Sequence, residues 1–246
     1  MAQLVARSVR DAEVVRSNRI TPTSYPGRII RVMLEVIITS LLGFGILLLT
    51  EWAAKHKKLG AELSRKIPHV VSSITIASWP FFISMRTVFW LGLMLTIATV
   101  LGRMFNLFPN SRSVDRRTWG DPLLGLGITV AALLNPTKWI FVAAILTLGL
   151  ADATAALVGK AIGKHRYKIK GHYKTIEGSL AFMIIAVAIT AWVVLVAPAG
   201  LNLAWPVILW LPFIATLVEG ITPYGLDNLL IPIVVVVVLN SLQAVS

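Results

Sequence analysis

The sequence predicts an all-α protein, a polytopic bundle of about eight transmembrane helices, within a range of about seven to nine. Hydrophobic residues make up 57% of its 246 residues, and the mean hydropathy is +0.80. Soluble domains are only about 45–50% apolar. The excess is concentrated in long apolar blocks separated by short polar stretches. A soluble domain of this length would have too little polar surface to cover such a core.

The elements follow one another along a single domain. Residues 1–28 are polar and rich in arginine, and they contain no apolar h-region, so they predict a retained basic tail rather than a secretory signal. Residues 29–246 are predicted to form one transmembrane domain. Its apolar blocks predict spans at about 30–52, 67–84, 87–108, 121–134, 139–158, 179–197, 203–219 and 228–243. The last block is rich in valine, but an unpaired strand is not viable in lipid, so it too is predicted to be helical.

Basic residues predict the orientation. The connections 53–66, 103–120 and 159–178 each contain at least four Lys or Arg residues. With eight spans these three connections lie on one face, and the positive-inside rule makes that face cytoplasmic. The basic tail would then lie on the opposite side. Either the first span is not a simple crossing, or the three connections outweigh the tail.

Composition excludes several kinds of chemistry. The chain has no cysteine, which excludes disulfides and thiolate sites, and its four histidines form no HExxH motif. A net charge of +12 is compatible with a nucleic acid, anionic lipid or phosphorylated partner. In a membrane protein much of this charge is explained by topology, and we expect no nucleic-acid partner.

The eleven acidic residues are informative because acids in or beside a span tend to face a cavity or a partner. Asp152 ends the fifth predicted span among small residues. It is interpreted either as a ligand of Mg²⁺, which prefers carboxylate oxygens, or as an incidental acid at a helix-packing site. Glu219 and Asp227 return to the same predicted face. Capping of the last helix would explain Asp227 but not Glu219 as well.

Glycines and lysines follow Asp152 closely. Backbone N–H groups and ammonium groups neutralise phosphate, while carboxylates hold the metal. The segment is not a Walker A loop, because residues 159–165 are one residue short and lack Ser or Thr after the lysine. A glycine pair spaced by four is, by itself, typical of helix packing. The residues concerned are Gly159, Gly163, Lys164, Lys174, Thr175, Glu177, Gly178 and Ser179.

Lys66 and His69 lie three residues apart near the start of the second predicted span, and Pro68 fits a first helical turn there. The functional interpretation is that these basic residues bind phosphate. Anchoring by positive charge would explain Lys66 but not His69.

Together these segments resemble the CTP-dependent polyprenol and lipid kinases, the family of dolichol kinase, phytol kinase and CTP-type diacylglycerol kinase. The resemblance covers about residues 62–235. Its segments are Arg65-Lys66-Ile67-Pro68-His69, Ala151-Asp152-Ala153 with Gly159 and Gly163, Lys174-Thr175-Ile176-Glu177-Gly178-Ser179, and Glu219-Gly220 with Asp227-Asn228-Leu229. The middle segment is also similar to phosphatidate cytidylyltransferase, but the C-terminal signature of that enzyme is absent. Ala151 stands where the kinases often have glycine, and Ser72 and Ser73 occupy a stretch where a glycine is expected.

The resemblance implies an enzyme that transfers the terminal phosphate of CTP to a lipid alcohol, with Mg²⁺ as cofactor, at the cytoplasmic face. The lipid alcohol would reach the site from the bilayer. It implies catalytic roles for Asp152, Lys174, Asp227 and His69, and metal ligation by Asp152, Glu177, Glu219 and Asp227. The residues implied in nucleotide or phosphate binding are Lys66, Gly159, Gly163, Lys164, Lys174, Thr175, Gly178, Ser179 and Asn228. The alternatives are cytidylyl transfer to a lipid phosphate, and a transporter or flippase. The sequence leaves the identity of the alcohol and the oligomeric state open.

Overall fold

The computed structural model describes residues 61–105, 119–197 and 205–243, together with single residues between 30 and 52. Two compact units are distinguished, residues 1–38 and 39–246, and every element discussed below belongs to the second. The predicted basic tail, 1–28, lies outside the described residues. Of the first predicted span only scattered helical residues are described, for example Met33 and Leu41.

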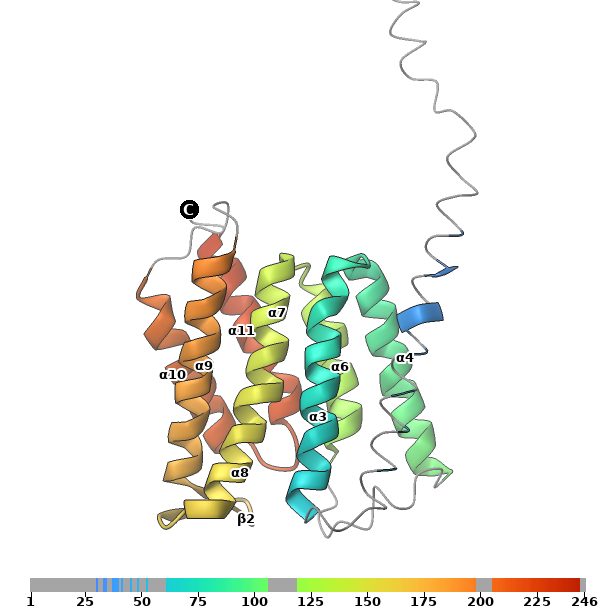
Figure 1. Ribbon diagram of the computed structural model, residues 1–246. Coiled ribbons are helices and arrows are strands. Elements are labelled where there is room, and N and C mark those ends of the chain that lie inside the picture. The colour runs from blue at the N-terminus through green and yellow to red at the C-terminus, as the bar shows by residue number, and fades with distance from the viewer. Residues whose placement is uncertain are drawn as a thin grey trace, which may run out of the picture. The chain divides into compact units, whose positions relative to one another are not determined.

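The second unit is a bundle of helices with one small β-hairpin (Figure 1). Helix α3 spans Ala61–Ser78 and is followed by the short helix η3 (Trp79–Phe81), α4 (Met85–Met104) and α6 (Gly120–Leu133). The next three elements, α7 (Lys138–Leu146), the π-helical segment η4 (Thr147–Ala151) and α8 (Asp152–Ile162), form one continuous rod. Strands β1 (Arg166–Ile169) and β2 (His172–Thr175) precede α9 (Ile176–Val196), α10 (Val207–Ile221) and α11 (Asp227–Gln243).

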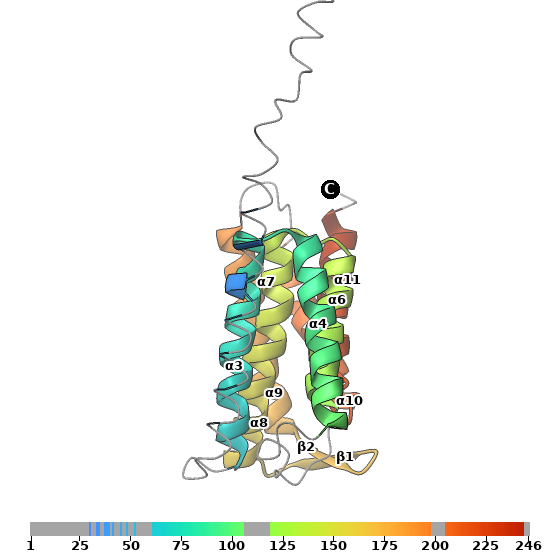
Figure 2. The same ribbon diagram turned by 90° about the vertical axis from the view of Figure 1, so that its right-hand side faces the viewer.

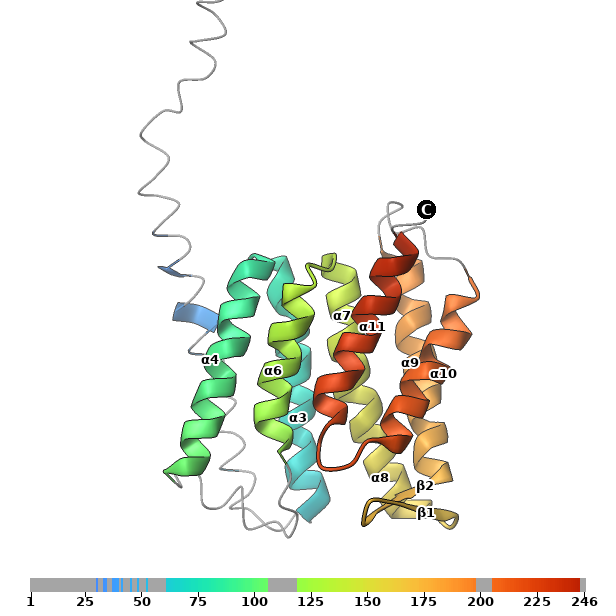
Figure 3. The same cartoon turned by 180° about the vertical axis from the view of Figure 1, so that it is seen from behind.

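The helices of this unit run side by side, and the hairpin lies at one end of them (Figures 1 and 2). Helix α4 packs against α6, α6 against α11, α8 against α9, and α9 against α10. The start of α3, the hairpin and the α10–α11 turn all lie at the same end, which we call the hairpin end (Figure 3). Segments far apart in the sequence therefore meet there.

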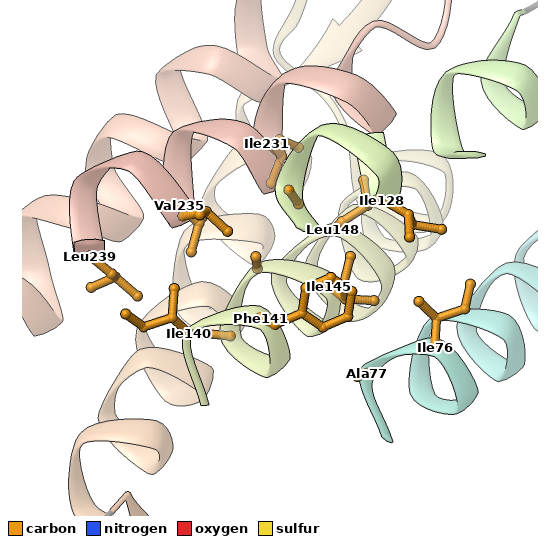
Figure 4. Packing of buried hydrophobic residues seen from close by; sticks show 14 of the residues in the cluster. Ile76, Ala77, Ile128, Ile140, Phe141, Ile145, Leu148, Ile231, Val235 and Leu239 are labelled. Carbon is orange, nitrogen blue, oxygen red and sulfur yellow. The ribbon is translucent and has the colours of Figure 1, made fainter. Parts of the chain in front are cut away.

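The rod α7–η4–α8 is the centre of the bundle. In the most apolar 18-residue stretch of this rod, 67% is buried inside the protein, whereas the corresponding shares are 22% in α4 and 28% in α9. All of Ile140–Ile145 is buried. These side chains pack against Ile76 and Ala77 of α3 and against Ile231, Val235 and Leu239 of α11 (Figure 4). A helix that is apolar on all sides belongs in such an interior position.

The outer helices expose apolar stripes. On α10 the exposed large side chains recur every four residues, which places them on one helix face: Leu209, Phe213, Leu217 and Ile221. A soluble protein rarely exposes so much contiguous apolar surface. Three of the described helices, α4, the rod and α9, are long and apolar enough to cross a membrane, and α6, α10 and α11 are shorter apolar helices. The chain is accordingly an integral membrane protein made mostly of helix, and the predicted number of about eight spans stays a prediction.

The second span begins earlier than predicted. Helix α3 starts at Ala61 and not near residue 67, so Pro68 lies inside the helix and not in its first turn. Hydropathy locates the apolar run rather than the helix. Here the polar first turns of α3 are helical as well, and they carry Lys66 and His69 toward the rod.

The connection 159–178 contains structure that the all-α prediction missed. Strands β1 and β2 pair antiparallel, with Ile169 opposite His172 and Tyr167 opposite Lys174. The two residues between the strands, Lys170 and Gly171, both have positive φ angles of 43° and 88°. Positive φ at both central residues is the signature of a type I′ hairpin turn. The whole connection 159–178 was predicted to be a loop, but residues 159–162 belong to the last turn of α8.

Candidate functional site

The first component of the site is a buried ion pair between α3 and the rod. Lys66 Nζ donates a hydrogen bond to Asp152 Oδ2 at 2.5 Å, and the two side chains are only 4% and 13% exposed. His69 Nε2 lies 3.5 Å from the same carboxylate oxygen. A lysine buried this deeply requires an opposite charge. The structure thus brings together three residues that the sequence singled out in two distant segments.

A close approach of two helices positions this pair. The π-helical segment η4 ends at Ala151, directly before Asp152, and π-bulges are frequent at functional sites. Within that segment Gly149 faces Ser73 of α3, and a Cβ atom at Gly149 would lie 2.1 Å from the Ser73 Cβ. Ser73 Oγ is buried and accepts or donates no hydrogen bond within the described part of the chain. The absence of a side chain at Gly149 therefore lets α3 lie close to the rod, about one helical turn from Asp152 and about two turns from Lys66.

The second component joins the hairpin to the end of α10. Lys174 Nζ donates to Glu219 Oε1 at 2.6 Å and also to the backbone carbonyl of Glu219. Their side chains are 17% and 7% exposed. The other carboxylate oxygen of Glu219, Oε2, accepts a hydrogen bond from Ser179 Oγ at 3.5 Å. The hydroxyl of Tyr167 lies 2.8 Å from Ser179 Oγ, within hydrogen-bonding distance. Tyr167 and Lys174 are paired across the hairpin, so both side chains are on the face that meets α10.

Asp227 connects the two components. It is the first residue of α11, is half-buried, and interacts electrostatically with Asp152, Glu219, Lys66 and Lys174. Its Oδ1 accepts a hydrogen bond at 3.0 Å from the backbone N–H of Asn228, whose side chain in turn donates to the carbonyl of Gly120. We call Lys66, Asp152, Lys174, Glu219 and Asp227 the charged cluster.

Glu177 and Lys164 engage each other away from these pairs. Glu177 Oε1 accepts from the backbone N–H groups of Lys164 and His165, at 3.1 and 3.2 Å, and lies 2.7 Å from His165 Nδ1. Glu177 thereby fastens the end of α8 to the start of α9. The Lys164 side chain is exposed. The predicted metal-binding role of Glu177 and phosphate-binding role of Lys164 stay predictions.

The predicted phosphate-binding glycines lie where α8 packs against α9. A Cβ atom at Gly159 would come within 2.6 Å of Thr175 Oγ1, and one at Gly178 within 2.8 Å of the carbonyl oxygen of Ala155. At Gly163 a Cβ atom would meet the backbone of Gly159 and the methyl group of Thr175. Thr175 caps α9 by accepting from the Gly178 N–H at 3.1 Å. These four residues thus serve helix packing and capping. Packing is the alternative that the sequence left open for the Gly159–Gly163 pair, and the predicted phosphate binding of all four residues stays a prediction.

The charged cluster fits a metal ion that is shared with a phosphate group. In the ranges that the structure describes, no group of three or more His, Asp or Glu side chains is close enough to hold a metal by itself. Mg²⁺, however, is usually bound by one or two carboxylates, with waters and substrate phosphates as its other ligands. Asp152 offers such a carboxylate, and Lys66 and Lys174 offer the cations that phosphate oxygens prefer.

Comparison with curated proteins finds a relative of known activity. Phytol kinase of Synechocystis sp. is 29% identical to the chain over 178 residues, which are 70% of this chain and 76% of the relative. The resemblance to the polyprenol and phytol kinases is thereby confirmed. No family model and no solved structure matches the chain.

The sequence analysis did not single out two tyrosines that the structure places at the site. Tyr167 completes the hydrogen-bonded chain to Glu219, and Tyr224 fastens the α10–α11 turn to the hairpin through a bond to the carbonyl of Lys170. The available signal was local: two short segments of alternating residues, 166–169 and 172–175, flank Lys170-Gly171. That pattern predicts a hairpin, and a hairpin would have put Tyr167 beside Lys174.

Proposed function

We propose that this protein is a membrane lipid kinase that transfers the terminal phosphate of CTP to the hydroxyl of a lipid alcohol. The similarity to phytol kinase favours a long-chain isoprenoid alcohol over diacylglycerol as that substrate. The observation that carries the proposal is the charged cluster: two lysines and three carboxylates gathered at one end of an apolar bundle. A water-soluble nucleotide and a membrane-bound alcohol can meet at such a place.

The composition of the cluster supports phosphoryl transfer. This reaction requires little covalent chemistry from the protein, and catalysis comes from positioning and from neutralising charge on the phosphate oxygens. Lys66 is on α3 and Lys174 is on the hairpin, so two separate elements each supply a cation to the cluster. Each is now paired with a carboxylate, and each would turn its ammonium group to a phosphate oxygen in the nucleotide complex.

The residues divide the chemistry as follows. Asp152 would hold a Mg²⁺ ion shared with the phosphates, and this ion would supply further neutralisation of charge. The alcohol oxygen forms a bond to the terminal phosphorus, the bond from that phosphorus to its bridging oxygen breaks, and CDP leaves. Asp227 accepts the alcohol proton, because Asp152 already accepts from the ammonium group of Lys66, whereas within the described ranges the side chain of Asp227 accepts only from the N–H of Asn228 in its own helix turn. His69 lies close enough to Asp152 to orient it.

The lipid would reach the cluster from the side. The exposed apolar stripe on α10 ends at Ile221, two residues beyond Glu219. An alcohol with its tail along such a surface would present its hydroxyl at the hairpin end. Cytoplasmic placement of this end is supported by the exposed basic residues Lys160, Lys164, Arg166, Lys168 and Lys170.

The test of the activity uses the full chain in lipid nanodiscs with CTP labelled at the terminal phosphate, Mg²⁺, and a panel of phytol, geranylgeraniol, dolichol and diacylglycerol, with phosphatidate added as an acceptor for cytidylyl transfer. We expect label in the lipid product and CDP as by-product. Release of pyrophosphate would identify a cytidylyltransferase instead, and binding of CTP without turnover of any lipid would favour a transporter. Asp152→Asn should abolish turnover, whereas Asp121→Asn, an exposed acid at the same end, serves as the matched control.

The test of orientation uses the absence of cysteine from the chain. Lys168→Cys places a single thiol on the hairpin, and Lys138→Cys places one at the opposite end, where α7 begins. In intact cells a membrane-impermeant maleimide should label only Lys138→Cys. Labelling of Lys168→Cys alone would reverse the proposed orientation.

A further inference from the structure

Tyr224 is an exposed aromatic residue held in a strained backbone conformation. It lies in the turn between α10 and α11 with a φ angle of 61°. Positive φ is uncommon for residues other than glycine, and for a bulky side chain it is an outlier. Such strain persists only where the surroundings enforce it, and it is concentrated at functional sites.

The ring of Tyr224 is fixed at its hydroxyl and against one neighbour. The hydroxyl donates to the carbonyl oxygen of Lys170 at 3.1 Å. The ring meets His172 edge to face, with centroids 4.4 Å apart and an angle of 87° between the planes. Its backbone carbonyl accepts from the N–H of Trp119, which precedes α6. Nevertheless 46% of the Tyr224 residue is exposed, so these contacts position the side chain and leave much of the residue open to solvent.

This ring borders the charged cluster. Tyr224 lies between Glu219 and Asp227 in the sequence, and its Cα atom is at most about 11 Å from that of Asp227, because three residues of chain span no more. Its partners Lys170 and His172 are on the hairpin that carries Lys174. The turn and the hairpin lie at the same end of the bundle (Figure 3).

We propose that Tyr224 is the platform on which the base of the donor nucleotide stacks while its triphosphate reaches Lys66 and Lys174. This inference rests on the proposed function. Stacking on an aromatic ring needs a fixed face that is open to solvent, and the base gains most when the ring does not have to be ordered on binding. If Tyr224 served only to attach the turn to the hairpin, its hydroxyl and its contact with His172 would be sufficient, and its exposed surface would have no role.

Two substitutions and two ligands distinguish base stacking from a role in holding the hairpin. Tyr224→Phe keeps the ring and removes the hydroxyl, whereas Tyr224→Leu removes the ring. The ligands are CTP and inorganic tripolyphosphate, both with Mg²⁺, and the second has no base. Affinities are measured by equilibrium dialysis on the full chain in nanodiscs. Tyr173→Leu, which removes an exposed tyrosine from the same hairpin, is the matched control.

We expect Tyr224→Leu to weaken CTP binding by about tenfold and to leave tripolyphosphate binding unchanged. Tyr173→Leu should bind both ligands as the wild type does, and Tyr224→Phe, which keeps the ring, should lose much less CTP affinity than Tyr224→Leu. Unchanged CTP binding by Tyr224→Leu overturns the inference. Equal losses for both ligands also overturn it, because they would show that Tyr224 acts only by holding the hairpin. A wild-type chain that binds neither ligand overturns the proposed function itself, which is a different result.

Discussion

The two lysine–carboxylate pairs of the site are held in different ways. Lys66 and Asp152 join α3 to the central rod, and the lysine makes one hydrogen bond, to one carboxylate oxygen. Lys174 and Glu219 join a two-stranded hairpin to the end of α10, and the lysine donates to both the side chain and the backbone of the same residue. Ser179 and Tyr167 extend this second pair into a chain of hydrogen bonds.

This difference indicates how each lysine is positioned. The first pair depends on helix packing, since Gly149 and Ser73 set how closely α3 approaches the rod. A substitution at either residue that alters this close approach would shift the whole of α3 relative to the rod. The second pair depends on hydrogen bonds at the edge of the bundle, where loss of one bond leaves the others in place. We therefore expect substitutions at the first pair to reduce both stability and activity, and substitutions at the second to act mainly on nucleotide affinity.

The largest effect is expected from Asp152→Ala. Removing one partner of a buried pair leaves the other charge unpaired, so the free energy of unfolding should fall by about 3 kcal/mol. The double variant Lys66→Met/Asp152→Leu should recover most of that stability and none of the activity. The measurement is chemical denaturation in detergent, together with the CTP-dependent assay. A double variant as unstable as Asp152→Ala would show that packing, rather than charge, limits stability here.

The next effect is expected from Gly149→Ala. In an ordinary helix this change stabilises by about 1 kcal/mol. Here the new methyl group would collide with Ser73, and overpacking of a core costs about 1–3 kcal/mol, so we expect net destabilisation and loss of activity. Ser73→Gly in the same chain should restore both, because it removes the colliding atoms. Failure of this rescue, or a stabilised Gly149→Ala variant, would contradict the close approach of the two helices.

A smaller and more specific effect is expected from Lys174→Met. The free energy of unfolding should fall less than in Asp152→Ala, because Glu219, although only 7% exposed, keeps its hydrogen bond from Ser179. The substitution removes a charged donor to phosphate, and hydrogen bonds to charged groups contribute about 1.5–3 kcal/mol. The KM for CTP should therefore rise by at least about tenfold. Lys168→Met, on the opposite face of the hairpin, is the control. Equal effects of the two substitutions would indicate a general loss of positive charge.

The smallest effect is expected from Tyr167→Phe, which removes only the hydroxyl bonded to Ser179. A neutral hydrogen bond contributes about 0.5–1.5 kcal/mol, so the KM for CTP should rise several-fold with little change in kcat. Ser179→Ala should have a similar effect, and the double variant should be no worse than either single variant, because all three break the same chain of bonds. Additive effects would mean that the two hydroxyls act independently.

Several sequence-based interpretations depended on local patterns, and these were the more successful ones. Apolar blocks predicted most of the helices within a few residues, because burial in lipid is a property of a short segment. The hairpin was missed because two strands of four residues give little periodic signal inside a polar connection. The start of α3 was misplaced because its first turns are polar on the side that faces the rod.

The glycines show the limit of a motif. The pattern Gly159-x-x-x-Gly163 is compatible with phosphate binding and with helix packing, and the sequence could not choose between them. The neighbours show that the glycines serve packing, because a Cβ atom there would meet another element, while phosphate binding stays a prediction. Thr175 and Ala155 are those neighbours for Gly159 and Gly178.

The sequence by itself determined that this is a helical membrane protein, which polar residues interrupt its apolar blocks, and which family it resembles. Only the tertiary structure decided which of those residues meet. Lys66 lies 86 residues from Asp152, and Lys174 lies 45 residues from Glu219. Hydropathy measures the preference of each segment for lipid or water and says nothing about partners. Pairing across such separations depends on how the helices pack, and here packing brings together a strand of the hairpin, the first turns of α3, α8 and α11, and the end of α10.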